Sequence, residues 1–219
     1  MAGIIPGEPT RIRLVIHMRS YDYDLFRSLF CLVDDAYGVM TDDRIFTIRE
    51  KLTDEIIRDH LYGRKRIGTM FIDPDDRSDQ LVIDIDEQRI DQATRILQVF
   101  EELGIYAYLE SSKSKGFHIR SHWDLPFPAS ELRKIGKYIA LRAEIPEAEV
   151  FPKQDSRGEG GLGNFMFLPL HGESLKDGKT AILDPENDFK PVPEPWDALA
   201  AIKKALRGNE WVNFTRSSP

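Results

Sequence analysis

The chain has 219 residues, of which 41% are hydrophobic, and its 30 basic against 37 acidic side chains give a net charge of −7. This length can bury a substantial core in one large or two small domains. The acidic balance excludes a global basic field for gripping nucleic acid, although a groove on an acidic protein can be locally basic. The single cysteine, Cys31, excludes an internal disulfide framework and a cysteine-rich zinc ribbon.

The hydropathy of the sequence predicts no association with a membrane. The sequence contains no run of about 18 apolar residues, and residues 1–13 lack the apolar core of a secretion signal. With one cysteine and no visible export signal, we expect a cytoplasmic protein in a reducing compartment.

The first third of the chain predicts a small α/β unit. Glycine and proline interrupt residues 1–19, which are expected to form a lead-in segment. The elements predicted for the N-terminal α/β unit, residues 20–76, are a helix over 20–31 with Ser20 as candidate cap, a helix over 53–62 opened by Thr53, a strand over 67–72 and a turn over 73–76.

The rest of the chain, residues 77–210, predicts a second unit before a tail over 211–219. Strands are expected over 81–86, 105–109, 117–123, 149–151, 165–170 and 180–183, and helices over 88–103, 129–142 and 196–206. This order of strands and helices predicts an α+β fold with an antiparallel or mixed sheet backed by helices.

The strand predicted over 81–86 carries two carboxylates, Asp84 and Asp86. Because side chains alternate along a strand, both point to one face while Ile83 and Ile85 point to the other. Two such charges, about 7 Å apart along the strand, repel each other unless a cation or solvent compensates them. The pair indicates either a divalent-metal site, since Mg²⁺ takes oxygen ligands, or a strand end that emerges into water.

A polar loop over 111–116 leads directly into the strand predicted over 117–123. The side chains suited to contact phosphate are Ser112, Ser114, Lys115 and His118, with Arg120 and His122 on the same strand face as His118. Beside a carboxylate pair, this row fits a triphosphate. The alternative is a hairpin turn with a solvated strand face.

A third carboxylate, Glu149, opens the strand predicted over 149–151, and a glycine-rich loop follows before the strand over 165–170. This loop matches neither GxGxxG after a strand nor a Walker-type phosphate loop. It can bring backbone close to a ligand, or it is a flexible connector. The basic clusters at 64–66 and 133–137, each taken alone, are typical of a solvated surface.

The chain resembles the archaeo-eukaryotic primase superfamily in the strings LVIDIDE, ESSKSKGFHI and EVFPKQ…GLGNFMFLPLHG, which occur in that order. The upstream segment DHLYGRKRIGTMFIDPDDRSDQLVIDID fits the same pattern. Over residues 20–172 the resemblance is closer to CRISPR-associated primase-polymerases and to related primases of conflict systems and mobile elements. It implies an RRM-like catalytic sheet joined to an N-terminal α/β unit.

The resemblance also implies a template-dependent primase-polymerase that makes DNA or RNA from nucleoside triphosphates with two Mg²⁺ or Mn²⁺ ions. The implied metal ligands are Asp84, Asp86 and Glu149, with Asp155 as a competitor because the family's third acid is usually aspartate. The implied nucleotide contacts are Ser112, Ser114, Lys115, His118 (also catalytic), Arg120, Lys153 and Asn164, and the implied template contacts are Arg64, Lys65, Arg66, Arg133 and Lys137. Implied partners are single-stranded or primer–template nucleic acid and accessory helicase, CRISPR or mobile-element proteins.

Two other classes of function stay open on the sequence. A non-catalytic nucleic-acid-binding module with an RRM-like sheet needs aromatic side chains on its exposed face, where this sequence has carboxylates. A metal-dependent phosphohydrolase or nuclease also uses acidic pairs, but it does not need the Ser-Lys-Gly-His loop.

Overall fold

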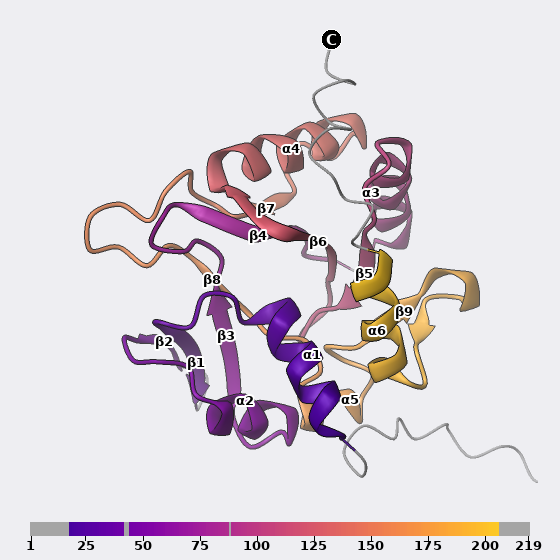
Figure 1. The fold of residues 1–219 in the computed structure, drawn as a ribbon. Helices are drawn as coiled ribbons and strands as arrows, with labels where there is room; N and C mark the ends of the chain where they lie inside the picture. Colours follow the sequence, from indigo (N-terminus) through magenta and orange to yellow (C-terminus); the bar gives the residue numbers. More distant parts are fainter. Residues whose placement is uncertain (1–17, 42–43, 88, 206–219) are drawn as a thin grey trace, which may run out of the picture.

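The computed structural model describes residues 18–41, 44–87 and 89–205 (Figure 1). Residues 1–17 of the predicted lead-in segment and the predicted tail, 211–219, lie outside the described residues. The helices are α1 (Ser20–Phe30), α2 (Asp54–Leu61), α3 (Ile90–Glu102), α4 (Ala129–Arg142), α5 (Gly172–Leu175) and α6 (Pro195–Ala205), with a 3-10 turn, η1 (Pro185–Asn187). Within those ranges, no helix has the length and apolar character needed to cross a membrane.

Two antiparallel sheets form the framework. The strands are β1 (Tyr37–Thr41), β2 (Arg44–Ile48), β3 (Arg66–Met70), β4 (Arg77–Ile85), β5 (Tyr108–Ser111), β6 (Phe117–Pro128), β7 (Glu149–Phe151), β8 (Phe165–Phe167), β9 (Ile182–Asp184) and β10 (Lys190–Pro191). The four-stranded sheet has the order β2-β1-β3-β8, and the six-stranded sheet has the order β10-β9-β5-β6-β4-β7. The predicted α+β class is confirmed. Because β8 pairs with β3, the first sheet combines strands from both parts of the chain.

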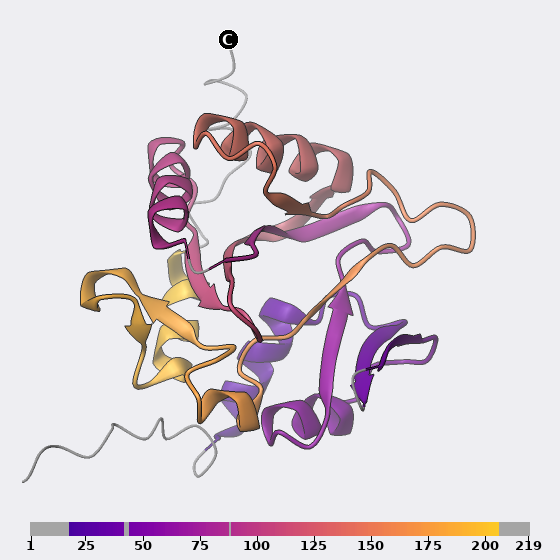
Figure 2. The same cartoon turned by 180° about the vertical axis from the view of Figure 1, so that it is seen from behind.

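The larger sheet contains a split β-α-β unit. Its chain order is β4-α3-β5-β6-α4-β7, and its strands lie in the order β5-β6-β4-β7, which is the ferredoxin-like arrangement of an RRM-type sheet. Helices α3 and α4 cover one face (Figures 1 and 2), where Ile83 and Ile85 enter the main core. On the other face, Val82 packs with Phe71 and Met166 from the region of the four-stranded sheet. The face that carries Asp84 therefore lies between the two sheets.

Local signals placed several elements correctly. The helix over 129–142 and the strand over 149–151 have the predicted bounds. Thr53 caps α2 and accepts a hydrogen bond from the Ile56 amide. The cap of α1 is Arg19 rather than Ser20, because Asp22 accepts hydrogen bonds from the Arg19 backbone and guanidinium.

Other bounds differ for reasons that lie in the contacts. The strand predicted over 105–109 begins at Tyr108, because Ile105 still closes α3 by donating its amide to Phe100 after the left-handed Gly104. Strands β4 and β6 are longer than predicted, because they pair with each other as far as Arg77 and Pro128. The hairpin β1–β2 was not predicted, and it forms the outer part of the four-stranded sheet.

Candidate active site

The acidic pair stands where two hollows of the surface meet. Asp84 is the last residue but one of β4, opposite His118 of β6, and Asp86 directly follows the strand. Both carboxylates line a 380 Å³ pocket between the two sheets and a second hollow of 290 Å³ beside the start of α3. A molecule in either hollow would therefore contact the same two carboxylates.

The third carboxylate lies on the same face. Glu149 on β7 is directly opposite Asp84 on β4 in the antiparallel register, so their side chains are neighbours across the strands. Burial raises the pKa of the Asp84 carboxyl, and the negative charges of Asp86 and Glu149 add to the rise against the opposing effect of His118. Lys153 Nζ lies 2.7 Å from Glu149 Oε2 and partly balances this charge.

These carboxylates fit a divalent cation in the kind of donor they offer. Mg²⁺ and Mn²⁺ prefer carboxylate oxygens, and Asp84 and Asp86 both line the same two hollows. Among the described residues, no three His, Cys, Asp or Glu side chains already converge as a metal-binding group. The three carboxylates are therefore a candidate ligand set spread along one sheet face.

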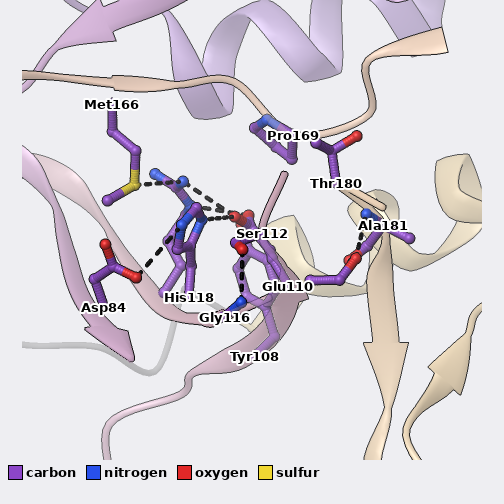
Figure 3. A network of polar contacts seen from close by, with 12 residues as sticks. Asp84, Tyr108, Glu110, Ser112, Gly116, His118, Met166, Pro169, Thr180 and Ala181 are labelled. Atoms are coloured by element: carbon purple, nitrogen blue, oxygen red, sulfur yellow. Dashed lines mark hydrogen bonds and ion pairs between the residues drawn. The ribbon is translucent and has the colours of Figure 1, made fainter. Parts of the chain in front are cut away.

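His118 lies between two carboxylates (Figure 3). Its Nε2 is 3.6 Å from Asp84 Oδ1, and its Nδ1 is 3.6 Å from Glu110 Oε2. The imidazole is mostly buried, with 15% of the side chain exposed, and it lines the 380 Å³ pocket. Each ring nitrogen of His118 therefore faces a carboxylate oxygen, one from β4 and one from β5.

The structure corrects the predicted role of Arg120. Its guanidinium is buried and donates to both carboxylate oxygens of Glu110, at 2.9 and 3.1 Å, and to Gln80 Oε1 at 2.7 Å. Burial would raise the pKa of Glu110, but Arg120 and His118 outweigh it and hold that pKa at about 2. Arg120 thus binds a carboxylate inside the protein rather than a nucleotide. His122, on the same face, is also buried, and its Nε2 lies 2.9 Å from the Tyr108 hydroxyl.

Glu110 is the residue of this site that the sequence analysis missed. It stands opposite His118 in the β5–β6 register. Counting outward from the Ser112–Gly116 turn would have found it, since Ser112 and Gly116 close the hairpin by a backbone hydrogen bond of 2.9 Å.

The side chain of Ser112 shapes the polar loop between β5 and β6. Ser112 Oγ accepts a hydrogen bond from the Gly116 amide at 2.8 Å (Figure 3). It also accepts one from the Ser114 amide at 3.2 Å. Gly116 lies so close to Ile85 that an added Cβ would overlap the Ile85 carbonyl oxygen. The glycine therefore allows the loop to approach the end of β4, next to Asp86.

The loop lysine that lines the pocket is Lys113 and not Lys115, which the sequence analysis had named. Lys113, Ser112 and Ser114 line the 380 Å³ pocket, and Lys113 Nζ lies 2.7 Å from Met40 Sδ of β1. Lys115 is exposed to solvent and is not part of the described lining of this pocket. Asn164 is also exposed, and its carbonyl accepts a hydrogen bond from the Phe71 amide.

The candidate template contacts fall on two separate surfaces. Arg64 and Lys65 are exposed and both contact Asp59, at 2.7 and 3.2 Å, whereas Arg66 is half-buried and donates to Ser174. Arg133 and Lys137 lie on α4, which covers the sheet face opposite to the acidic pair.

The competing third acid is occupied elsewhere. Asp155 Oδ1 lies 3.1 Å from Arg133 NH1 in an exposed ion pair. The structure therefore places Asp84, Glu149 and His118 on one sheet face, with Asp86 just beyond the end of β4, and leaves Asp155 beside α4.

The comparisons with known proteins identify the family of the chain. Residues 35–209 match the family model described as the archaeo-eukaryotic primase domain of the TOTE conflict system. The match spans most of the chain, and the chain therefore belongs to the archaeo-eukaryotic primase domains. Within that superfamily it belongs to the TOTE conflict-system family rather than to the CRISPR-associated primases.

One solved structure similar to this chain is the polymerase domain from Mycobacterium tuberculosis ligase D in complex with DNA. The two chains are 12% identical with a TM-score of 0.46, and the match covers 91% of this chain and 93% of that one. No curated protein matches the chain.

Proposed function

We propose that this protein is a template-dependent nucleotidyltransferase, a primase-polymerase that extends DNA or RNA with nucleoside triphosphates. The observation that carries the proposal is the composition of the 380 Å³ pocket, in which an acidic pair stands beside His118 and a serine- and lysine-containing loop. Membership of the archaeo-eukaryotic primase domains supports it.

Asp84, Asp86 and Glu149 would hold the Mg²⁺ or Mn²⁺ ions. When bound, these cations lower the pKa of the attacking 3′-hydroxyl and neutralise charge on the phosphates. The carboxylates would gather the cations where the two hollows meet, and the nucleotide would then occupy the 380 Å³ pocket and the primer terminus the second hollow.

His118 and the loop would bind the triphosphate. His118 and Lys113 both line the pocket. An imidazole N–H and a lysine ammonium would donate hydrogen bonds to phosphate oxygens, and such charge-assisted bonds are strong. In the transfer, the primer 3′-oxygen forms a bond to the α-phosphorus and loses its proton to solvent. The bond from the α-phosphorus to the bridging oxygen breaks, and pyrophosphate leaves with that electron pair.

Template binding would use exposed cations. The proposed contacts to the template backbone are Arg64 and Lys65, whose side chains are 60% and 54% exposed. Lysine and arginine neutralise backbone phosphates. In this proposal the six-stranded sheet supplies the catalytic carboxylates and His118, and the four-stranded sheet faces them across the pocket through β8 and Ile45 of β2.

Primer extension tests the function. The purified protein is given a labelled primer on a template, Mg²⁺ or Mn²⁺, and either deoxy- or ribonucleoside triphosphates, with the Asp84→Asn/Asp86→Asn variant as control. We expect metal-dependent extension by the wild-type protein and none by the variant. Metal-dependent cleavage of nucleic acid or hydrolysis of nucleotide without extension would replace the proposal with a nuclease or phosphohydrolase. Binding without any turnover would replace it with a binding module.

A further inference from the structure

The 380 Å³ pocket has an apolar wall opposite its phosphate-binding loop. The side chains of this wall are Ile45 from β2, Phe165 and Phe167 from β8, and Leu168 and Pro169 after β8. None of them has a part in metal or phosphate binding. A pocket with one acidic, one cationic and one apolar wall matches the chemical parts of a nucleotide, which are its reacting phosphate, its charged phosphate tail and its base.

The Phe165 ring closely approaches the backbone of two glycines. Gly38 on β1 and Gly68 on β3 are direct partners in the antiparallel register, and a Cβ added at either position would overlap ring atoms of Phe165. Glycine within a strand marks a place where another group approaches the backbone closely. The two glycines therefore form a floor on which the ring rests.

A second ring completes the wall. Phe167 lies two residues further along β8, and so on the same strand face, with its ring 5.4 Å from that of Phe165 at an interplanar angle of 82°. This edge-to-face contact restrains both rings. Both are partly exposed and both line the pocket, so their free surface faces the ligand space.

We propose that Phe165, supported by Gly38 and Gly68 and restrained by Phe167, is the stacking platform for the base of the incoming nucleoside triphosphate. The inference rests on the proposed function and names the part of the pocket that takes the base. Lys113 connects the two walls, because its Nζ lies beside Met40 on β1. The triphosphate at His118 and the base at Phe165 thus belong to one ligand.

The chemistry of the wall suits a templated enzyme. Such an enzyme must accept all four bases and leave their selection to pairing with the template. Stacking on an aromatic ring is tolerant of base identity, whereas side-chain hydrogen bonds to base edges would favour one base. The described wall residues are apolar and carry no such donors or acceptors in their side chains. The pocket volume also falls in the range of small-molecule sites, about 300–1,000 Å³.

The experiment compares two probes that share a triphosphate and differ in the base. Dissociation constants of nucleoside triphosphates and of inorganic tripolyphosphate, each with Mg²⁺, are measured by calorimetry for wild type, Phe165→Ala, Phe165→Leu and Gly38→Ala. Phe165→Leu keeps apolar volume without an aromatic face, and Gly38→Ala keeps the ring but displaces it. The matched control is Leu141→Ala, a 63% exposed apolar position on α4, on the far side of the larger sheet. Thermal unfolding verifies that each variant is folded.

We expect Phe165→Ala, Phe165→Leu and Gly38→Ala to weaken nucleoside triphosphate binding about tenfold, the effect of losing one base stack, with tripolyphosphate binding and Leu141→Ala unchanged. Equal weakening of both probes would overturn the inference, because the ring would then only support the fold. A loss of template affinity with unchanged nucleotide affinity would also overturn it. Wild-type protein that binds neither probe would overturn the proposed function itself, which separates the two failures.

Discussion

Asp84 and Glu149 are direct partners across the β4–β7 strand pair. The register therefore places two carboxylates side by side on one sheet face, and Asp86 lies just past the end of β4. This register favours Glu149 as the third acid of the proposed site, since the aspartate nearby, Asp155, is paired with Arg133.

The first prediction compares the two candidates for the third acid. Glu149→Gln should lower the rate of primer extension by about 100-fold or more, as for the loss of a charged group aimed at the reacting centre. Asp155→Asn breaks only an exposed ion pair, worth about 0–1 kcal/mol, and should leave the rate nearly unchanged. Single-turnover extension with saturating Mg²⁺ measures both. The reverse ranking would show that the site closes through the glycine-rich loop.

The second prediction concerns the charge at Asp84. The pKa of the Asp84 carboxyl is raised in the folded protein, so the folded state binds its proton more tightly than the unfolded state does. The stability of the protein therefore falls as the pH rises from the pKa of the unfolded state through the pKa of the folded state. Above that window the ionised carboxylate destabilises the fold. Asp84→Asn should therefore raise the melting temperature at pH 7 in the absence of metal, while it abolishes synthesis.

The check is a series of melting temperatures from pH 3 to pH 8 in a chelating buffer, with Asp155→Asn as control. The difference between Asp84→Asn and wild type should grow with pH and then level off. A variant less stable than wild type at pH 7 without metal would contradict the assignment of like-charge strain at this face.

The third prediction separates nucleotide from template. His118→Ala should raise the KM for nucleoside triphosphate, because a hydrogen bond to a charged phosphate contributes about 1.5–3 kcal/mol, which corresponds to a factor of about 10 to 150. Template affinity, measured by fluorescence anisotropy, should change little. If template affinity fell and the KM held, β6 would belong to the template path instead.

The fourth prediction ranks the two lysines of the loop. Lys113 lines the pocket, while Lys115 is exposed. Lys113→Ala should therefore weaken nucleotide binding by about tenfold or more, as expected for a charge-assisted contact, and Lys115→Ala should have a smaller effect that fades in 0.5 M salt, since exposed charges are screened. Equal, salt-sensitive losses would indicate that the loop acts through its net charge alone.

The features that the sequence predicted correctly depend on residues close together in the chain. Strand alternation put Asp84, Asp86 and His118 on shared faces, and the helix over 129–142 fixed where β7 begins. Pairing between distant strands decided the rest. Alternation also put Arg120 on the face of His118, but the neighbouring strand β5 supplies Glu110, and that carboxylate takes the guanidinium out of reach of a ligand.

The β1–β2 hairpin was missed for a related reason. Strand β2 is exposed on both faces over most of its length, so it lacks the alternation of apolar and polar residues by which a half-buried strand is recognised. Strand β2 pairs with β1, β1 pairs with β3, and β3 pairs with β8. The position of β2 therefore depends on pairing between strands that are distant in the sequence. The apolar wall of the pocket, to which Ile45 contributes, was therefore not visible in the sequence.

The last prediction tests the buried pair beneath His118. Glu110 and Arg120 are almost fully buried, with side chains 1% and 3% exposed, and the pKa of Glu110 is lowered to about 2. A carboxyl whose pKa is lowered by folding stabilises the protein at any pH above the pKa of the unfolded state. This stabilisation is lost as the pH falls toward the pKa of the folded state. The wild-type protein should therefore lose this contribution between about pH 5 and pH 2.

Glu110→Gln leaves the guanidinium of Arg120 buried without a counter-charge, which should destabilise the protein by about 3–5 kcal/mol in urea unfolding. Replacing both partners with apolar side chains, as in Glu110→Leu/Arg120→Met, should recover most of that loss, because the uncompensated charge disappears. The double variant still lacks the carboxylate that lies 3.6 Å from His118 Nδ1, so its KM for nucleoside triphosphate should stay raised although its stability returns. A double variant with wild-type stability and wild-type KM would show that the pair serves the fold alone and that Asp84 suffices to orient His118.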